Sequence, residues 1–162
     1  MEALAVVTSA AFVVLLVAAC ITDLRARLIP NWIVIAMCAV WLAGEIVEIT
    51  ICKISLPDVI CSLGTNIATS LIFGGGLLLF TLAFEAITNK SSMGGGDIKL
   101  LATCALYLGL QRSALCLLIA CAVSIPLALI IPHTPFAQKD EGKGALPFAP
   151  AIAIGAIIAM VF

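Results

Sequence analysis

The sequence predicts an all-α fold, that of a polytopic integral membrane protein with about six transmembrane helices. Its 162 residues are 64% hydrophobic and only 10% charged, with a mean hydropathy of +1.27. Soluble domains are roughly 45–50% apolar and about 25% charged. The apolar runs are continuous instead of alternating, which argues against a lipid-facing β-barrel. One span takes about 20 residues, so we expect a single transmembrane domain over residues 1–162.

Polar and proline-containing segments divide the chain into its expected helices. Arg25, Arg27 and Pro30 separate the first two apolar runs, and Pro30 suits the first turn of the second helix. The run after Asp58 is long for one span and short for two, so we expect one long helix, tilted or kinked at three central glycines. A polar turn at Gln111-Arg112-Ser113 separates the next two runs. The expected spans are about 3–22, 31–51, 59–88, 98–110, 114–131 and 145–162.

The basic residues are distributed unevenly between the two sides of this six-span arrangement. One side carries Arg25, Arg27, Lys90, Lys99, Lys139 and Lys143, and the other carries Lys53 and Arg112. By the positive-inside rule the first side is cytoplasmic. Both termini are then expected outside, and Asp23 and Asp97 share the cytoplasmic side.

These two aspartates are the main candidate functional residues. Asp23 ends the first apolar run, and Asp97 closes the glycine run Gly94-Gly95-Gly96. An ionisable residue at membrane depth is costly and is a functional candidate by default. Two carboxylates can activate a water by general acid–base chemistry. The glycines would allow positive φ or a close helix approach. Alone, this motif fits a loop with a capping aspartate better, but Asp23 on the same side reverses that balance.

Three segments carry a resemblance to a known family. Asp23 to Trp32 places an acid, two bases and a helix start close together, and it is joined by MGGGDIKLLA (93–102) and LPFAPAIAIGA (146–156). With these segments the chain resembles the type IV prepilin peptidases, the G-x-G-D intramembrane aspartyl proteases of the bacterial inner membrane. The resemblance implies that Asp23 and Asp97 catalyse removal of prepilin leader peptides at the cytoplasmic face, in type IV pilus biogenesis and protein secretion.

The resemblance also implies a set of supporting residues and the absence of a cofactor. Longer family members carry an N-terminal region with paired cysteines that supports N-methylation, and we expect the short form found with Flp-type (tight adherence) pili. No metal or other cofactor is expected. The expected partners are a prepilin or pseudopilin precursor and the lipid bilayer, without nucleic acid. Ala149 stands where family members commonly have Gly. The expected supporting residues are Gly94, Gly95, Gly96, Lys99, Pro30, Asn31, Pro147 and Pro150.

Other interpretations remain open at the level of the sequence. A small transporter or channel could use its acids as a proton or cation relay, although both best candidates lie at one face. A structural pilus-assembly partner is a third possibility. Glu85 either joins the site or is an interfacial carboxylate, and Lys99 either contacts a lipid or substrate anion or simply extends to the membrane surface. Helix ends favour placing a proton shared by the pair on Asp23.

Overall fold

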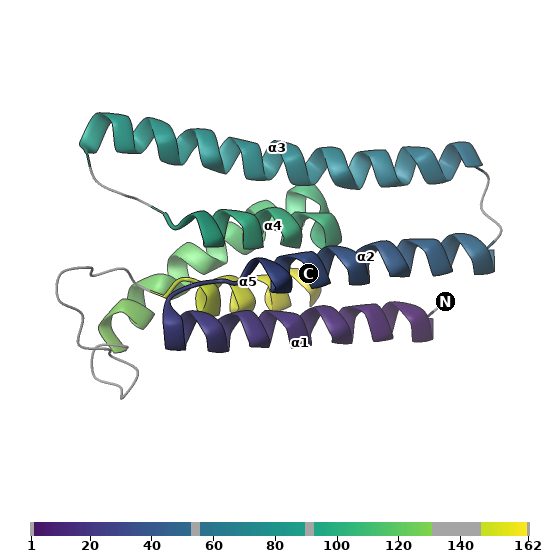
Figure 1. The fold of residues 1–162 in the computed structure, drawn as a ribbon, viewed down its shortest axis with the longest axis horizontal. Coiled ribbons are helices and arrows are strands. Elements are labelled where there is room, and N and C mark those ends of the chain that lie inside the picture. The colour runs from purple at the N-terminus through teal and green to yellow at the C-terminus, as the bar shows by residue number, and fades with distance from the viewer. Residues whose placement is uncertain (1, 53–55, 90–92, 131–146, 162) are drawn as a thin grey trace.

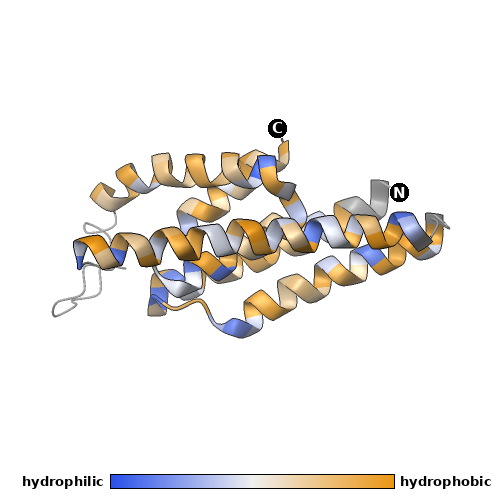
Figure 2. Cartoon of the chain, turned by 90° about the horizontal axis from the view of Figure 1, so that it is seen from above, coloured by the Kyte–Doolittle hydropathy of each residue, from blue (hydrophilic) through white to orange (hydrophobic). Residues whose placement is uncertain are grey.

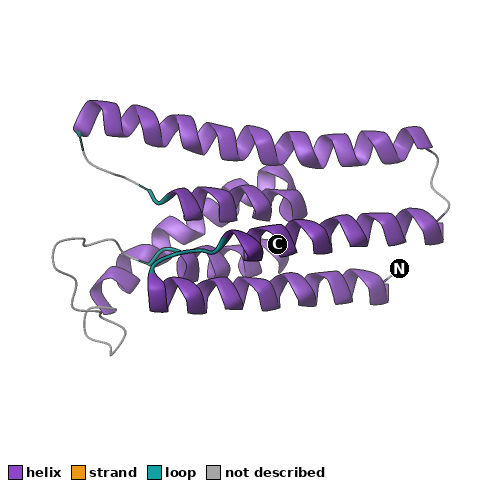
Figure 3. Cartoon of the chain, in the orientation of Figure 1, coloured by secondary structure: helices purple, strands orange, loops and turns teal. Residues whose placement is uncertain are grey.

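The computed structural model describes residues 2–52, 56–89, 93–130 and 147–161, and all regular elements among them are α-helices (Figure 3). They are α1 (Glu2–Ala26), α2 (Asn31–Cys52), α3 (Leu56–Thr88), α4 (Gly95–Ile130) and α5 (Ala149–Val161). The first four are long and apolar enough to cross a membrane, and α5 is a shorter apolar helix. Apolar residues cover most of the length of these helices (Figure 2). The predicted all-α, multi-pass membrane architecture is therefore confirmed in outline.

The helix boundaries differ from the expected ones at two places. The stretch that was ambiguous in the sequence is one 33-residue helix, α3, which runs through its central glycines. The prediction of a turn at 111–113 is wrong. Those residues are helical, and the break in α4 lies at Gly109 (φ 71°, ψ 175°). Glycine has no Cβ and tolerates a positive φ. The Ser113 hydroxyl also satisfies the Gly109 carbonyl at 2.6 Å. Pro126 stays within helical geometry.

The last helix also starts later than expected. We predicted a span from residue 145, but α5 begins at Ala149, and Pro147 and Phe148 precede it without helical structure. Residues 145 and 146 lie outside the described part of the chain. The start at Ala149 places Pro150 in the first turn, where its missing N–H breaks no helical hydrogen bond.

The helix ends that matter for function gather at one end of the bundle. In Figure 1, α1 ends there, α2, α4 and α5 begin there, and α3 ends there. After Gly109, α4 turns back toward the same end. The loop between α1 and α2 and the start of α4 are thus neighbours, although about 65 residues separate them in the sequence.

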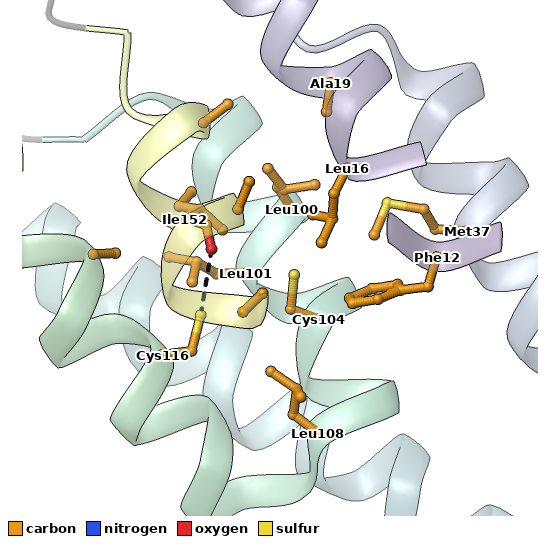
Figure 4. Packing of buried hydrophobic residues seen from close by; sticks show 14 of the residues in the cluster. Phe12, Leu16, Ala19, Met37, Leu100, Leu101, Cys104, Leu108, Cys116 and Ile152 are labelled. Carbon is orange, nitrogen blue, oxygen red and sulfur yellow. Dashed lines mark hydrogen bonds between the residues drawn. The ribbon is translucent and has the colours of Figure 1, made fainter. Parts of the chain in front are cut away.

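Helix α4 lies at the centre of the packing, and α5 packs more closely against it than any other described helix does. The buried cluster includes Phe12 and Leu16 from α1, Leu101 from α4 and Ile152 from α5 (Figure 4). A Cβ added at Gly155 would lie 2.5 Å from the Cys116 carbonyl oxygen, so α5 touches the second half of α4 backbone to backbone. Small residues allow such close approach within membranes.

Helix α3 packs against α4 along a narrower strip. The Ser70 hydroxyl donates to the Ala102 carbonyl at 2.6 Å, and a Cβ at Gly74 would lie 2.6 Å from that of Ala102. Near the opposite end of the bundle, the Asn66 side-chain amide donates to Glu45 of α2 at 3.2 Å. Most of the remaining α3 surface is exposed and apolar, with Leu79 and Phe80 each 69% exposed. This is the surface expected of a helix that faces lipid.

Candidate active site

Asp23 lies in the last turn of α1 and is buried, with only 5% of its surface exposed. Its Oδ2 accepts a hydrogen bond of 3.0 Å from the Ala149 N–H, at the first residue of α5. Helix α1 ends just beyond it, where Arg27 adopts a left-handed conformation (φ 49°) and donates its N–H to the Asp23 carbonyl at 2.8 Å. The Arg27 charge also interacts with the Asp23 carboxylate. The end of α1 thus presents one buried carboxylate with a backbone donor already in place.

Asp97 lies in the first turn of α4 and is half-buried. The Gly94 carbonyl accepts the N–H groups of Asp97 at 3.0 Å and Ile98 at 3.3 Å, so the helix starts within the glycine run, at Gly95. A Cβ at Gly94 would lie 3.0 Å from Asp97 Oδ2, so a larger residue would crowd the carboxylate.

The glycine run acts through close approach and not through positive φ. Among the described glycines a positive φ occurs only at Gly109. A Cβ at Gly96 would lie 3.3 Å from Ile29 Cβ in the loop between α1 and α2. Gly95 is exposed and has no such neighbour within 4 Å. Gly96 therefore lets the start of α4 lie against the loop that follows Asp23.

Asp23 and Asp97 lie close enough to interact electrostatically. One carboxylate comes from the C-terminal end of α1 and the other from the N-terminal end of α4. A second contact joins the same elements, because the Lys99 ammonium donates to the Asn31 side-chain carbonyl at 3.1 Å. The three segments singled out in the sequence therefore meet at one place, with the Asp23 to Trp32 segment in contact with both of the others.

The remaining predicted residues lie near helix ends at the same end of the bundle, and one of them, Glu85, is a further carboxylate. Pro30 is half-buried in the loop before α2, Pro147 is buried before α5, and Pro150 is half-buried in the first turn of α5. Glu85 is half-buried in the last turn of α3. Within the described residues no three His, Cys, Asp or Glu side chains gather as a potential metal site. The chemistry available from these described side chains is that of a carboxylate pair.

One participant was not identified from the sequence, namely the backbone N–H of Ala149. The segment was noted for its prolines, but a backbone donor has no side-chain signature. One signal was available. The first N–H groups of any helix lack acceptors within it, so the helix start after Pro147 and Phe148 had to offer free backbone donors. The partner of that donor depends on tertiary packing.

Comparison with known proteins agrees with this geometry. Residues 10–129, which include both aspartates, match the type IV leader peptidase family. The chain belongs to this family. The resemblance drawn from the three segments is thereby confirmed.

Several curated relatives of this type IV leader peptidase family member carry the name prepilin leader peptidase/N-methyltransferase. The chain is 33% identical to one from Pseudomonas putida over 149 residues, covering 91% of this chain and 46% of the relative. It is 30% identical to one from Bacillus subtilis (strain 168) over 151 residues, covering 93% and 54%. The chain thus spans about half the length of the curated relatives that it matches. No solved structure matches it.

Proposed function

We propose that this chain is a membrane-embedded aspartyl endopeptidase that removes the leader peptide of prepilin-like precursors. The observation that carries the proposal is the meeting of Asp23 and Asp97, from opposite ends of different helices, at one end of the bundle. Membership of the type IV leader peptidase family supports the same activity. The names of the relatives, prepilin leader peptidase/N-methyltransferase, support prepilins as the substrate class.

The proposed chemistry needs only the two carboxyl groups and a water. The ionised carboxylate takes a proton from the water as its oxygen attacks the scissile carbonyl carbon. The protonated carboxyl group donates its proton to the carbonyl oxygen. Collapse of the tetrahedral intermediate breaks the C–N bond: the leaving amine takes a proton from one carboxyl group, and a hydroxyl of the intermediate returns a proton to the other, which restores the shared proton of the pair. Two neighbouring carboxylates sharing one proton are suited to this exchange because both do not readily ionise together.

We further propose that the aspartate-bearing end faces the cytoplasm across the bacterial inner membrane. The two halves of α4, separated at Gly109, would each cross the bilayer, and with α5 the chain would then make six crossings. The six-to-two distribution of basic residues in the sequence supports this orientation. Both termini would lie outside the cytoplasm, and the short basic leader of a precursor would reach the site from the cytoplasm.

The orientation can be tested with single cysteines in a cysteine-free protein. Asn89→Cys lies at the aspartate end and Arg112→Cys lies beyond the break in α4. A membrane-impermeant thiol reagent added to intact spheroplasts should label Arg112→Cys and leave Asn89→Cys unlabelled until the membrane is opened. Labelling of Asn89→Cys in sealed spheroplasts would reverse the proposed orientation.

The activity itself is tested with purified protein reconstituted into liposomes. A candidate prepilin with an intact leader is added, and its size is followed by electrophoresis and mass spectrometry. The expected result is a single cut at the leader junction that persists in the presence of a metal chelator. A folded wild-type protein that leaves a panel of prepilins intact would contradict the proposal.

A further inference from the structure

The first residue of α5 is held by α1 on both sides of its backbone. The Ala149 N–H donates to Asp23 Oδ2 at 3.0 Å, and the Ala149 carbonyl accepts from the Cys20 thiol at 3.5 Å. Cys20 and Asp23 are three residues apart and therefore share one face of α1. Ala149 is fully buried and Asp23 is 5% exposed, so this contact lies away from bulk water.

The donor in this contact is a group that α5 cannot satisfy by itself. The first N–H groups of a helix have no carbonyl one turn earlier to bind, and the first intrahelical contact of α5 is the one from the Ile152 N–H to the Phe148 carbonyl at 3.1 Å. Asp23 therefore acts as a remote cap for α5. The same hydrogen bond holds Oδ2, one of the two carboxylate oxygens of Asp23, in a fixed direction.

The position of this donor is fixed by the packing of α5 on α4. Gly155 lies against the backbone of Cys116, and the Cys116 thiol donates to the Ile152 carbonyl at 3.7 Å (Figure 4). The first half of α4, which carries Asp97, contributes Leu100 and Leu101 to the same buried cluster as Ile152 of α5 (Figure 4), so the packing of α5 also relates the Ala149 N–H to Asp97. Helix α5 is thus part of the frame that sets their relative geometry.

We propose that the Ala149 N–H is a positioning group for the reaction: it binds Asp23 Oδ2 and so directs Oδ1 toward Asp97 and the attacking water. The inference rests on the proposed peptidase function. The group is part of the main chain, so its effect does not depend on the methyl side chain at position 149. The loss of a hydrogen-bond donor has a large free-energy cost for a buried carboxylate, because hydrogen bonds to charged groups are among the strongest in proteins.

The test replaces this one amide by an ester in the full-length protein. Ala149→lactic acid, introduced by nonsense suppression, removes the N–H and keeps the methyl group. Ala153→lactic acid is the matched control, because it removes an N–H from the helical ladder of the same buried helix. Cleavage of a prepilin is measured as kcat and KM, and the Asp23 carboxyl band is isolated by infrared subtraction of the Asp23→Asn spectrum.

The expected result is a fall in kcat of about 10- to 100-fold for Ala149→lactic acid, with KM within about twofold of wild type. Ala153→lactic acid should keep kcat within a few fold, and only the ester at 149 should shift the Asp23 band. Equal kcat losses for the two esters, or an unshifted Asp23 band, would overturn the inference. If wild-type protein cleaves no prepilin, the proposed function fails, and the infrared band alone then decides whether Ala149 positions Asp23.

Discussion

Helices α3 and α5 both pack on α4, but they do so in opposite ways. Helix α5 has 13 residues, of which seven are buried, and its first N–H binds Asp23. Helix α3 has 33 residues, of which Val59, Gly74 and Thr81 are the buried ones among those whose exposure is described. The long helix leaves most of its apolar surface exposed, whereas the short one lies inside the bundle and reaches a candidate catalytic side chain.

This difference separates two requirements that hydropathy alone does not distinguish. A helix that crosses the bilayer must be long and apolar, and α3 meets that condition fully. A helix that supports an active site must hold its groups within a fraction of an ångström, which requires close packing. The alanines and glycine of α5 provide that packing because they let two backbones touch.

Among the variants that test this difference between α3 and α5, Gly155→Ala is expected to have the largest effect on stability and cleavage. Its Cβ would lie 2.5 Å from a backbone oxygen of Cys116, which cannot move without shifting the helix. Overpacking of this kind typically costs about 1–3 kcal/mol of unfolding free energy. We expect prepilin cleavage to fall by about an order of magnitude, which corresponds to about 1.4 kcal/mol in the barrier. Thermal unfolding in detergent and cleavage rate are the two measurements.

The control for Gly155→Ala is Gly75→Ala, where an added Cβ meets no heavy atom within 4 Å. Gly75→Ala should be neutral or slightly stabilising, because alanine favours a helix over glycine by about 1 kcal/mol. Equal unfolding temperatures and rates for the two variants would mean that the close contact between α4 and α5 is not a constraint.

A smaller effect on cleavage is expected from Gly74→Ala, which forces α3 away from α4. The added Cβ would lie 2.6 Å from the Ala102 side chain, five residues beyond Asp97 in the sequence. We expect a loss of about 1–2 kcal/mol in stability with cleavage reduced by only about threefold. The compensating pair Gly74→Ala with Ala102→Gly should recover most of the stability, because the crowding methyl group is then absent. Failure of that pair to recover would place the crowding elsewhere.

The smallest effect is expected from Asn31→Ala, which removes the hydrogen bond to Lys99 at the aspartate end. Lys99 is exposed, and such a bond contributes about 0.5–1.5 kcal/mol. Because this contact is exposed, we expect a contribution at the lower end of that range, and cleavage should fall by only about twofold. Asn66→Ala is the matched variant at the other end of the bundle, where it removes the bond between α3 and Glu45. If Asn66→Ala slows cleavage as much as Asn31→Ala does, the two ends are not functionally distinct.

The sequence predicted the fold class, the single long helix at α3 and a shared end for Asp23 and Asp97. These follow from hydropathy and from the alternation of successive spans, both of which are local properties. The break in α4 was misplaced, because polarity marked residues 111–113 whereas the backbone bends where Gly109 permits a positive φ. The role of the glycine run was only half anticipated, since Gly96 provides close approach to Ile29 but no positive φ occurs there.

The position of α5 could not be predicted, and it changes one argument about the aspartate pair. Placing the shared proton on Asp23 compared the C-terminal end of α1 with the N-terminal end of α4. That argument did not include the start of α5, a third helix end, where the Ala149 N–H donates to the Asp23 carboxylate. Where the proton resides is still a prediction, and infrared spectra of the Asp→Asn variants address it.

The central claim is that Asp23 and Asp97 together catalyse prepilin cleavage, and the most direct measurement is the cleavage rate of Asp23→Asn and Asp97→Asn beside Asp58→Asn. Asp58 lies in the first turn of α3, at the opposite end of the bundle. Each of the first two variants should accumulate in the membrane at the wild-type level and lose cleavage by a factor of about 100 or more, while Asp58→Asn keeps a near wild-type rate. Near wild-type cleavage by either Asp23→Asn or Asp97→Asn would contradict the account.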